Sequence, residues 1–174
     1  MFQRLAQGCD RLPGRIAQKQ NVEEVVSYYR ELASSQPDAY LPSLATALYN
    51  LSSMQSALGR SETALEASSE AVGICRRLAE ALPEAFLPDL ALSLNILALR
   101  LRERSQRSAS LEAARESLDL YRRLAADRPD SFLPDLARGL NNMGAMLSDD
   151  GRIEEALAVT REATECFQHL ASEY

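Results

Sequence analysis

The chain has 174 residues, of which 46% are hydrophobic and 25% charged, and its formal net charge is −6. This composition is typical of one folded domain and excludes a disordered chain. The acidic balance argues against binding of DNA or RNA, and no apolar run approaches the roughly 20 residues that cross a bilayer. Three cysteines without a Cys-x-x-Cys pair argue against a disulfide framework or a zinc site and favour the reducing cytoplasm.

The first predicted helix lies within residues 14–33, GRIAQKQNVEEVVSYYRELA. Asn21 and Glu24 have the spacing of a capping box, which favours a helix that begins at Val22. We interpret residues 2–12 as a short remnant of a preceding partner helix. Residues 1–36 are therefore predicted to form an incomplete first unit.

From residue 37 onward the chain repeats itself at an interval of 46 residues. Two series of prolines keep this interval, namely Pro37, Pro83 and Pro129, and Pro42, Pro88 and Pro134. Gly59 and Gly151 are two intervals apart, with Ser105 midway between them. Because several residue types share one period, we predict a single repeat domain over residues 1–174, with complete units at 37–82, 83–128 and 129–174.

The first helix of each unit is predicted to run from about the second proline to the glycine. In residues 83–128 its apolar residues fall at helical spacing and form one stripe, which consists of Leu90, Leu94, Leu97 and Leu101. A glycine in the left-handed conformation then closes the helix, as expected at Gly59 and Gly151.

The second helix is predicted to begin near Ser61, Ser108 or Arg152 and to end before the next proline. Residues 108–126 again carry one apolar stripe, which consists of Leu111, Ala114, Leu118, Tyr121 and Leu124. Short links make successive helices antiparallel. A single hairpin cannot cover its own apolar face, so the hairpins must stack on one another.

Residues 47–72, ALYNLSSMQSALGRSETALEASSEAV, align without gaps on the helical hairpin of a known family. Leu48, Leu51 and Ser52 take the large, large and small positions of its first helix, and Gly59 takes the turn position. The chain thus resembles a tetratricopeptide repeat protein, in a long-helix variant because the usual period is about 34 residues. The resemblance implies an all-α fold, a right-handed superhelical stack of antiparallel helical hairpins.

In that family, fixed positions of each first helix line a concave groove that binds a protein or peptide. The resemblance assigns twelve residues to a partner-binding groove: Tyr49, Asn50, Ser53, Leu92, Asn95, Ile96, Leu99, Arg102, Arg138, Asn141, Asn142 and Ala145. Asparagine side chains suit a peptide backbone because they both donate and accept hydrogen bonds. Two interpretations of Leu92, Ile96 and Leu99 stay open, since apolar residues at this spacing either hold a partner's side chain or pack against neighbouring helices.

No motif indicates catalysis, and we predict no catalytic residue, no cofactor and no metal site. His169, the only histidine, has no partner motif that would make it a general base. Cys75 and Cys166 occupy positions of the predicted core, where thiols are usually inert. The basic segment LRLRERSQR, residues 99–107, is interpreted as a solvated helix end rather than as a site for an anionic partner.

The predicted function is therefore that of a non-catalytic scaffold or adaptor, which binds a protein or peptide in the groove. The resemblance also leaves an alternative, a regulatory or sensor arm of a larger multi-domain bacterial signalling or defence protein, and self-association through an end face would be compatible with that alternative. Thr160, Thr164 and Gln168 make the last face more polar than the earlier ones, which favours a terminal cap near Tyr174. A fragment of a longer array is the other interpretation of that end.

Overall fold

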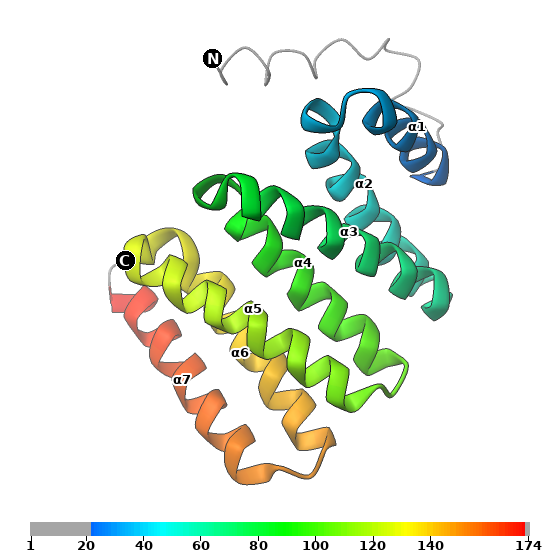
Figure 1. The fold of residues 1–174 in the computed structure, drawn as a ribbon. Helices are drawn as coiled ribbons and strands as arrows, with labels where there is room; N and C mark the ends of the chain where they lie inside the picture. The colour runs from blue at the N-terminus through cyan, green and yellow to red at the C-terminus, as the bar shows by residue number, and fades with distance from the viewer. Residues whose placement is uncertain (1–21, 173–174) are drawn as a thin grey trace.

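The computed structural model describes residues 22–172, and this part of the chain consists of seven α-helices joined by short turns (Figure 1). The helices are α1 (Val22–Ser35), α2 (Pro37–Ala57), α3 (Ser61–Ala81), α4 (Pro83–Glu103), α5 (Arg107–Asp127), α6 (Pro129–Asp149) and α7 (Ile153–Ser172). None of these helices combines the length and the apolarity that a membrane crossing requires. The segment 2–12 and the cap residue Asn21 lie outside the described residues.

The first helix of each hairpin starts at the first proline of its pair, not near the second as the sequence predicted. Proline suits this first helical position because its missing N–H would have no partner there, and its fixed φ already matches the helix. The second prolines, Pro42, Pro88 and Pro134, lie inside the helices. Each lies in the second turn and removes one backbone hydrogen bond there, but the helix continues through it.

The turns within the hairpins adopt the left-handed conformation that the sequence predicted. The φ angles are 73° at Gly59 and 77° at Gly151, and Ser105 has a φ of 58° at the same repeat position. Glycine takes this conformation without a steric penalty, whereas the Cβ of serine crowds the backbone there. The three hairpins therefore share one turn geometry, although only two of them have the residue that suits it.

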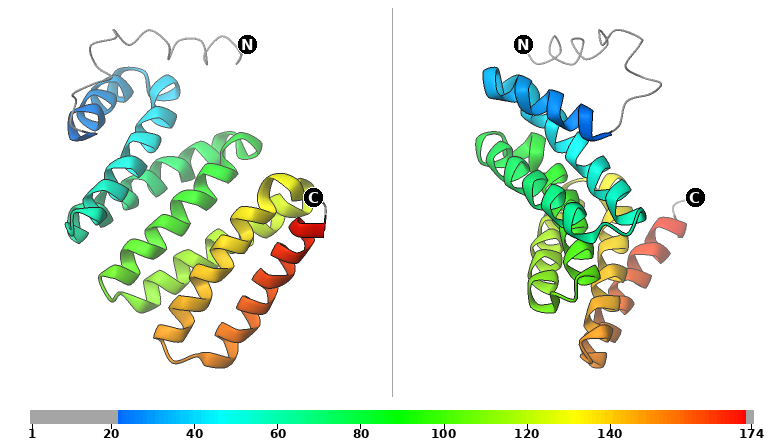
Figure 2. Two further views of the ribbon diagram at one scale, coloured as in Figure 1. Left: turned by 180° about the vertical axis from the view of Figure 1, so that it is seen from behind. Right: turned by 90° about the vertical axis from the view of Figure 1, so that its right-hand side faces the viewer.

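The helices stack as successive antiparallel hairpins (Figures 1 and 2), so the all-α repeat fold expected from the sequence is confirmed. Each helix packs against its neighbours in the chain, and the first helices α2, α4 and α6 also contact one another. The backbones of the second helices, α3, α5 and α7, do not approach one another as closely as those of the first helices do. The first helices therefore lie on the inner side of the curved stack.

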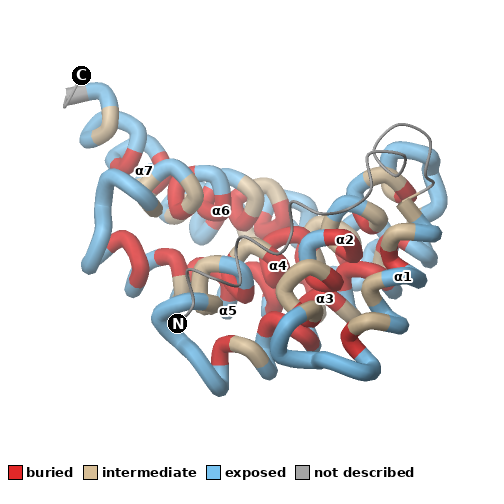
Figure 3. The backbone as a smooth tube through the Cα atoms, turned by 90° about the horizontal axis from the view of Figure 1, so that it is seen from above, coloured by how far each residue is buried: buried red, intermediate tan, exposed pale blue. Residues whose placement is uncertain are grey.

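Two apolar clusters form the core, one between α1 and α4 and the other between α4 and α7. The buried positions run along the interior of the stack, as Figure 3 shows by colour. Leu87, Leu97 and Leu120 are half-buried and pack against both clusters. The stripe predicted for the second helix of residues 83–128 is entirely buried, and Cys75 and Cys166 are buried as expected.

Along the outer side, an ion pair links each second helix to the next one. An arginine of one helix contacts a glutamate that follows it by 40 residues, and this happens three times: Arg30–Glu70, Arg76–Glu116 and Arg122–Glu162. The arginines recur at the repeat interval, and so do the glutamates. These pairs are substantially exposed, so we expect each to set the register of neighbouring hairpins more than to stabilise the fold.

Candidate functional site

All twelve residues that the sequence assigned to a groove belong to α2, α4 and α6, but their accessibility differs. Five are exposed, namely Asn50, Ser53, Arg102, Arg138 and Asn141. Five are half-buried, namely Tyr49, Leu92, Leu99, Asn142 and Ala145. Asn95 and Ile96 are only 4% and 8% exposed, so a partner cannot reach them without a rearrangement.

Some of these polar side chains already bind one another across the stack. Asn142 Nδ2 donates a hydrogen bond of 3.2 Å to Asn95 Oδ1, which joins α6 to α4. Arg102 Nε lies 2.6 Å from Asp149 Oδ2, again between α4 and α6. These side chains hold successive hairpins in register, and their hydrogen-bonding capacity is partly used before any partner arrives.

The three apolar groove candidates of α4, Leu92, Ile96 and Leu99, do not share one environment. Ile96 is buried, and Leu99 packs against the core cluster between α4 and α7, which matches the packing interpretation for both. Leu92 instead lines an open cleft on the inner side. The helical spacing of these apolar residues therefore does not tell which are buried and which are accessible, because that depends on the neighbouring helices.

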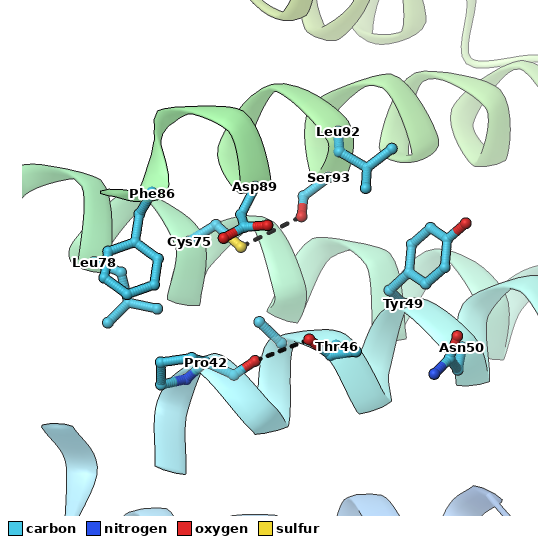
Figure 4. Close-up of a pocket in the computed structure, with 11 residues that line it drawn as sticks. Pro42, Thr46, Tyr49, Asn50, Cys75, Leu78, Phe86, Asp89, Leu92 and Ser93 are labelled. Atoms are coloured by element: carbon cyan, nitrogen blue, oxygen red, sulfur yellow. Dashed lines mark hydrogen bonds between the residues drawn. The ribbon is translucent and has the colours of Figure 1, made fainter. Parts of the chain in front are cut away.

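The cleft that Leu92 lines lies between α2, α3 and α4 and has a volume of about 280 Å³ (Figure 4). Its walls come from α2 (Pro42, Ala45, Thr46, Tyr49 and Asn50), α3 (Cys75 and Leu78) and α4 (Phe86, Asp89, Leu92 and Ser93). Three of these residues, Tyr49, Asn50 and Leu92, belong to the groove that the sequence predicted. A second hollow between α1 and α2 shares Thr46 and Asn50 with it, so the concave surface continues along α2.

Sequence reasoning missed the part of the cleft that comes from α3 and from the start of α4. The groove was assigned from first helices only, whereas Cys75 lies on a second helix and Phe86 precedes the positions considered. One signal for this part was present in the sequence. Cys75 stands at a repeat position where the other copies carry an aromatic residue, namely Tyr29, Tyr121 and Phe167. The absence of an aromatic ring at Cys75 was therefore visible in the sequence.

The chemistry of the cleft favours binding over reaction. Cys75 Sγ lies 3.3 Å from Ser93 Oγ, and burial raises the pKa of this thiol above its ordinary value. A protonated buried thiol with a hydroxyl as its neighbour is a poor nucleophile. Of the described residues that line the cleft, only Asp89 is charged at neutral pH; it is exposed, and partial desolvation raises the pKa of its carboxyl group. The cleft therefore offers apolar walls and one carboxylate.

A curved stack of helical hairpins with an open cleft on its inner side defines a helical repeat protein, a class that typically acts by binding. The sequence model of the tetratricopeptide repeat family matches residues 90–130 and 136–171, which correspond to most of α4 with α5 and of α6 with α7. These two segments therefore match tetratricopeptide repeats, which confirms the resemblance seen in the sequence.

Solved structures of the protein MamA overlap with most of the chain at low similarity. MamA 41-end from Desulfovibrio magneticus RS-1 is 18% identical, over 89% of this chain and 90% of that one, with a TM-score of 0.40. A MamA RS-1 ArsTM double mutant is also 18% identical, over 98% and 95% of the two chains, with a TM-score of 0.44. Another MamA crystal structure is 15% identical, over 91% and 95%, with a TM-score of 0.36. No curated protein matches the chain.

Proposed function

We propose that this protein is a non-catalytic adaptor that binds a segment of a partner protein along the inner side formed by α2, α4 and α6. The observation that carries the proposal is the cleft of about 280 Å³, which opens on this side and contains three of the residues predicted for the groove. Asn50, Ser53 and Asn141 extend the surface with exposed polar groups that suit a peptide backbone.

The mechanism we propose is presentation of fixed side chains by rigid helices. Packing on both sides holds α4 in place, so its inner face keeps one geometry before and after binding. The partner segment then bears most of the ordering cost, and apolar burial in the cleft offsets it. Nothing in this mechanism needs a cofactor, a metal, a nucleic acid or a membrane. We place the protein in the cytoplasm because its three cysteines include no Cys-x-x-Cys pair.

A pull-down from native lysate with mass spectrometry tests the proposal. The groove variant carries three exposed changes to bulky cations, Asn50→Arg, Ser53→Arg and Asn141→Arg. A matched control carries three such changes at exposed positions of second helices, Thr63→Arg, Ser69→Arg and Ala126→Arg. Both variants must show the helical circular dichroism of the wild type. We expect a partner that the wild type and the control retain and the groove variant loses, and equal retention by all three would contradict groove binding.

A second candidate function, a self-associating arm of a larger assembly, is favoured by the surface of α7. Leu157 and Phe167 are 62% and 46% exposed there, at the repeat positions of the buried residues Leu111 and Tyr121. Self-association through this face predicts a mass above the monomer by light scattering, lost in the double change Leu157→Ser and Phe167→Ser. A monomeric wild type at micromolar concentration would exclude this candidate.

A further inference from the structure

The cleft lies at a place where one repeat lacks a ring that the next repeat has. Cys75 of α3 lies one interval before Tyr121 of α5, which is 2% exposed and packs between α4, α5 and α6. At the corresponding place between α2, α3 and α4, the shorter side chain of Cys75 lines the cleft. Figure 4 shows Asp89 and Ser93 beside Cys75, with Phe86 and Leu78 to one side and Tyr49 to the other. Thr46 and Asn50 also stand where Leu92 and Ile96 stand in the next repeat.

The carboxylate of this cleft lacks a cation that its counterpart possesses. Asp135 in α6 binds Arg138 three residues later, with a distance of 2.5 Å between Oδ1 and Nη2. Asp89 is at the same repeat position in α4, but Leu92 replaces the arginine. Among residues 22–172, Asp89 forms no hydrogen bond or ion pair; it is an exposed residue, and the neighbouring cleft walls desolvate its carboxyl group only in part, which raises its pKa.

The aromatic ring at the edge of the cleft shows the same difference. Arg128 lies over the ring of Phe132, with its guanidinium carbon 4.8 Å from the ring centroid. Phe86 has the repeat position of Phe132, but Leu82 stands where Arg128 would be. Asp135 and Phe132 thus each have an arginine partner, Arg138 and Arg128, whereas their counterparts Asp89 and Phe86 have no arginine at the corresponding positions.

We propose that the cleft between α2, α3 and α4 is an arginine-binding subsite, in which a partner's guanidinium group pairs with Asp89 and lies against the ring of Phe86. This inference rests on the proposed function, and it defines the partner as a segment with an accessible arginine. The volume of about 280 Å³ is near the lower end of ligand sites, at roughly 300 Å³, which suits one long side chain.

Arginine fits this environment better than lysine does. Its planar guanidinium can bind a carboxylate through two parallel hydrogen bonds and can stack on an aromatic face, whereas an ammonium group is a compact and strongly hydrated charge. Tyr49, Leu78 and Leu92 provide apolar walls for the methylene groups of the side chain. The net charge of −6 also attracts a cationic segment at long range.

The test is a nuclear magnetic resonance titration of the ¹⁵N-labelled full chain with N-acetyl-arginine methylamide. The comparison probes are the citrulline derivative, which has nearly the same shape without the charge, and the lysine derivative. We expect the arginine probe to shift the backbone amides of the cleft, at Asp89, Leu92 and Cys75, and to bind about tenfold more tightly than the citrulline probe. Equal binding of the two probes, or shifts confined to another part of the stack, would overturn the proposal.

Three variants connect the binding to the proposed geometry. Asp89→Asn should weaken the arginine probe by about tenfold, because a charge-assisted pair becomes a neutral contact. Asp135→Asn is the matched control and should bind as the wild type does, since that carboxylate already has Arg138. The double change Cys75→Tyr and Leu92→Arg gives the cleft the residues of the later repeat and should abolish binding. Circular dichroism must show that each variant is folded.

The outcomes separate this inference from the proposed function. If the groove variant loses the partner but Asp89→Asn retains it, the arginine subsite is refuted and groove binding is not. Binding of the arginine probe at Asp89, combined with a partner that the groove variant retains, would support the subsite and refute the adaptor role of the groove. Loss of the partner in both variants, with retention by Asp135→Asn, is the result we expect.

Discussion

Replacing Tyr121 by cysteine tests whether a missing ring is what opens the cleft in the preceding repeat. The change gives α5 the residue that α3 carries at Cys75, and it removes a phenol ring that is only 2% exposed. Truncation of a buried aromatic side chain to alanine costs about 3–5 kcal/mol, which combines lost burial with the void left behind. Because the sulfur fills part of that void, we expect a loss of about 3 kcal/mol in the free energy of unfolding.

Phe167→Cys is the matched control, because Phe167 has the same repeat position in α7 and is 46% exposed. About half of its ring is already in contact with solvent and no closed void forms, so we expect a loss of about 1 kcal/mol. Both variants should remain folded, since domains are commonly stable by about 5–15 kcal/mol. The two variants should therefore differ by about 2 kcal/mol in the free energy of unfolding, and this difference tests whether the ring of Tyr121 fills a buried space.

The assay is urea unfolding of the full chain followed by far-ultraviolet circular dichroism, with the denaturant slope compared between variants. An unchanged slope shows that the array unfolds with the same cooperativity, which is required because repeats can unfold separately. If Tyr121→Cys costs no more than Phe167→Cys, the ring does not fill the space between α4, α5 and α6, and the account of the cleft is wrong. The reciprocal change Cys75→Tyr should cost less than about 1 kcal/mol, because its ring enters existing space.

Three further predictions concern the turns, the outer side and the thiols. Ser105→Gly should stabilise the protein by about 0.5–1 kcal/mol because φ is 58° at this residue, whereas Gly151→Ala should destabilise it. Thermal melting measures both effects, and equal shifts of the melting temperature in the two variants would contradict the turn argument. Arg76→Gln should cost less than about 1 kcal/mol in urea unfolding, and the cost should vanish at high salt, because its pair with Glu116 is exposed; a cost that persists at 1 M salt would point to packing instead. Burial raises the pKa of the Cys75 thiol, so at pH 8 a smaller fraction of it is thiolate than in a free cysteine. Iodoacetamide should therefore modify Cys75 slowly until urea unfolds the chain. Rapid labelling of the folded protein, measured by mass spectrometry, would contradict this prediction.

The sequence alone determined the architecture, because the features that define it are local. Helix starts follow from proline, turns follow from glycine, and the buried stripes follow from apolar residues at helical spacing. Because these features recur every 46 residues, the helices and turns assigned in one unit could be transferred to the next unit. The predicted start of the first helices was too late, because a proline normally marks the first turn of a helix, whereas Pro42 is the sixth residue of α2 and the helix runs through it.

Only the tertiary structure decided which predicted groove residues are accessible. Asn95 and Asn142 bind each other, and Arg102 binds Asp149, because the stacking of α4 on α6 brings residues 47 positions apart into contact. No local pattern encodes that stacking. The cleft was likewise hidden, since a cavity depends on the volume that three helices leave unfilled, and a single cysteine in place of a tyrosine changes that volume without changing the helical pattern of the sequence.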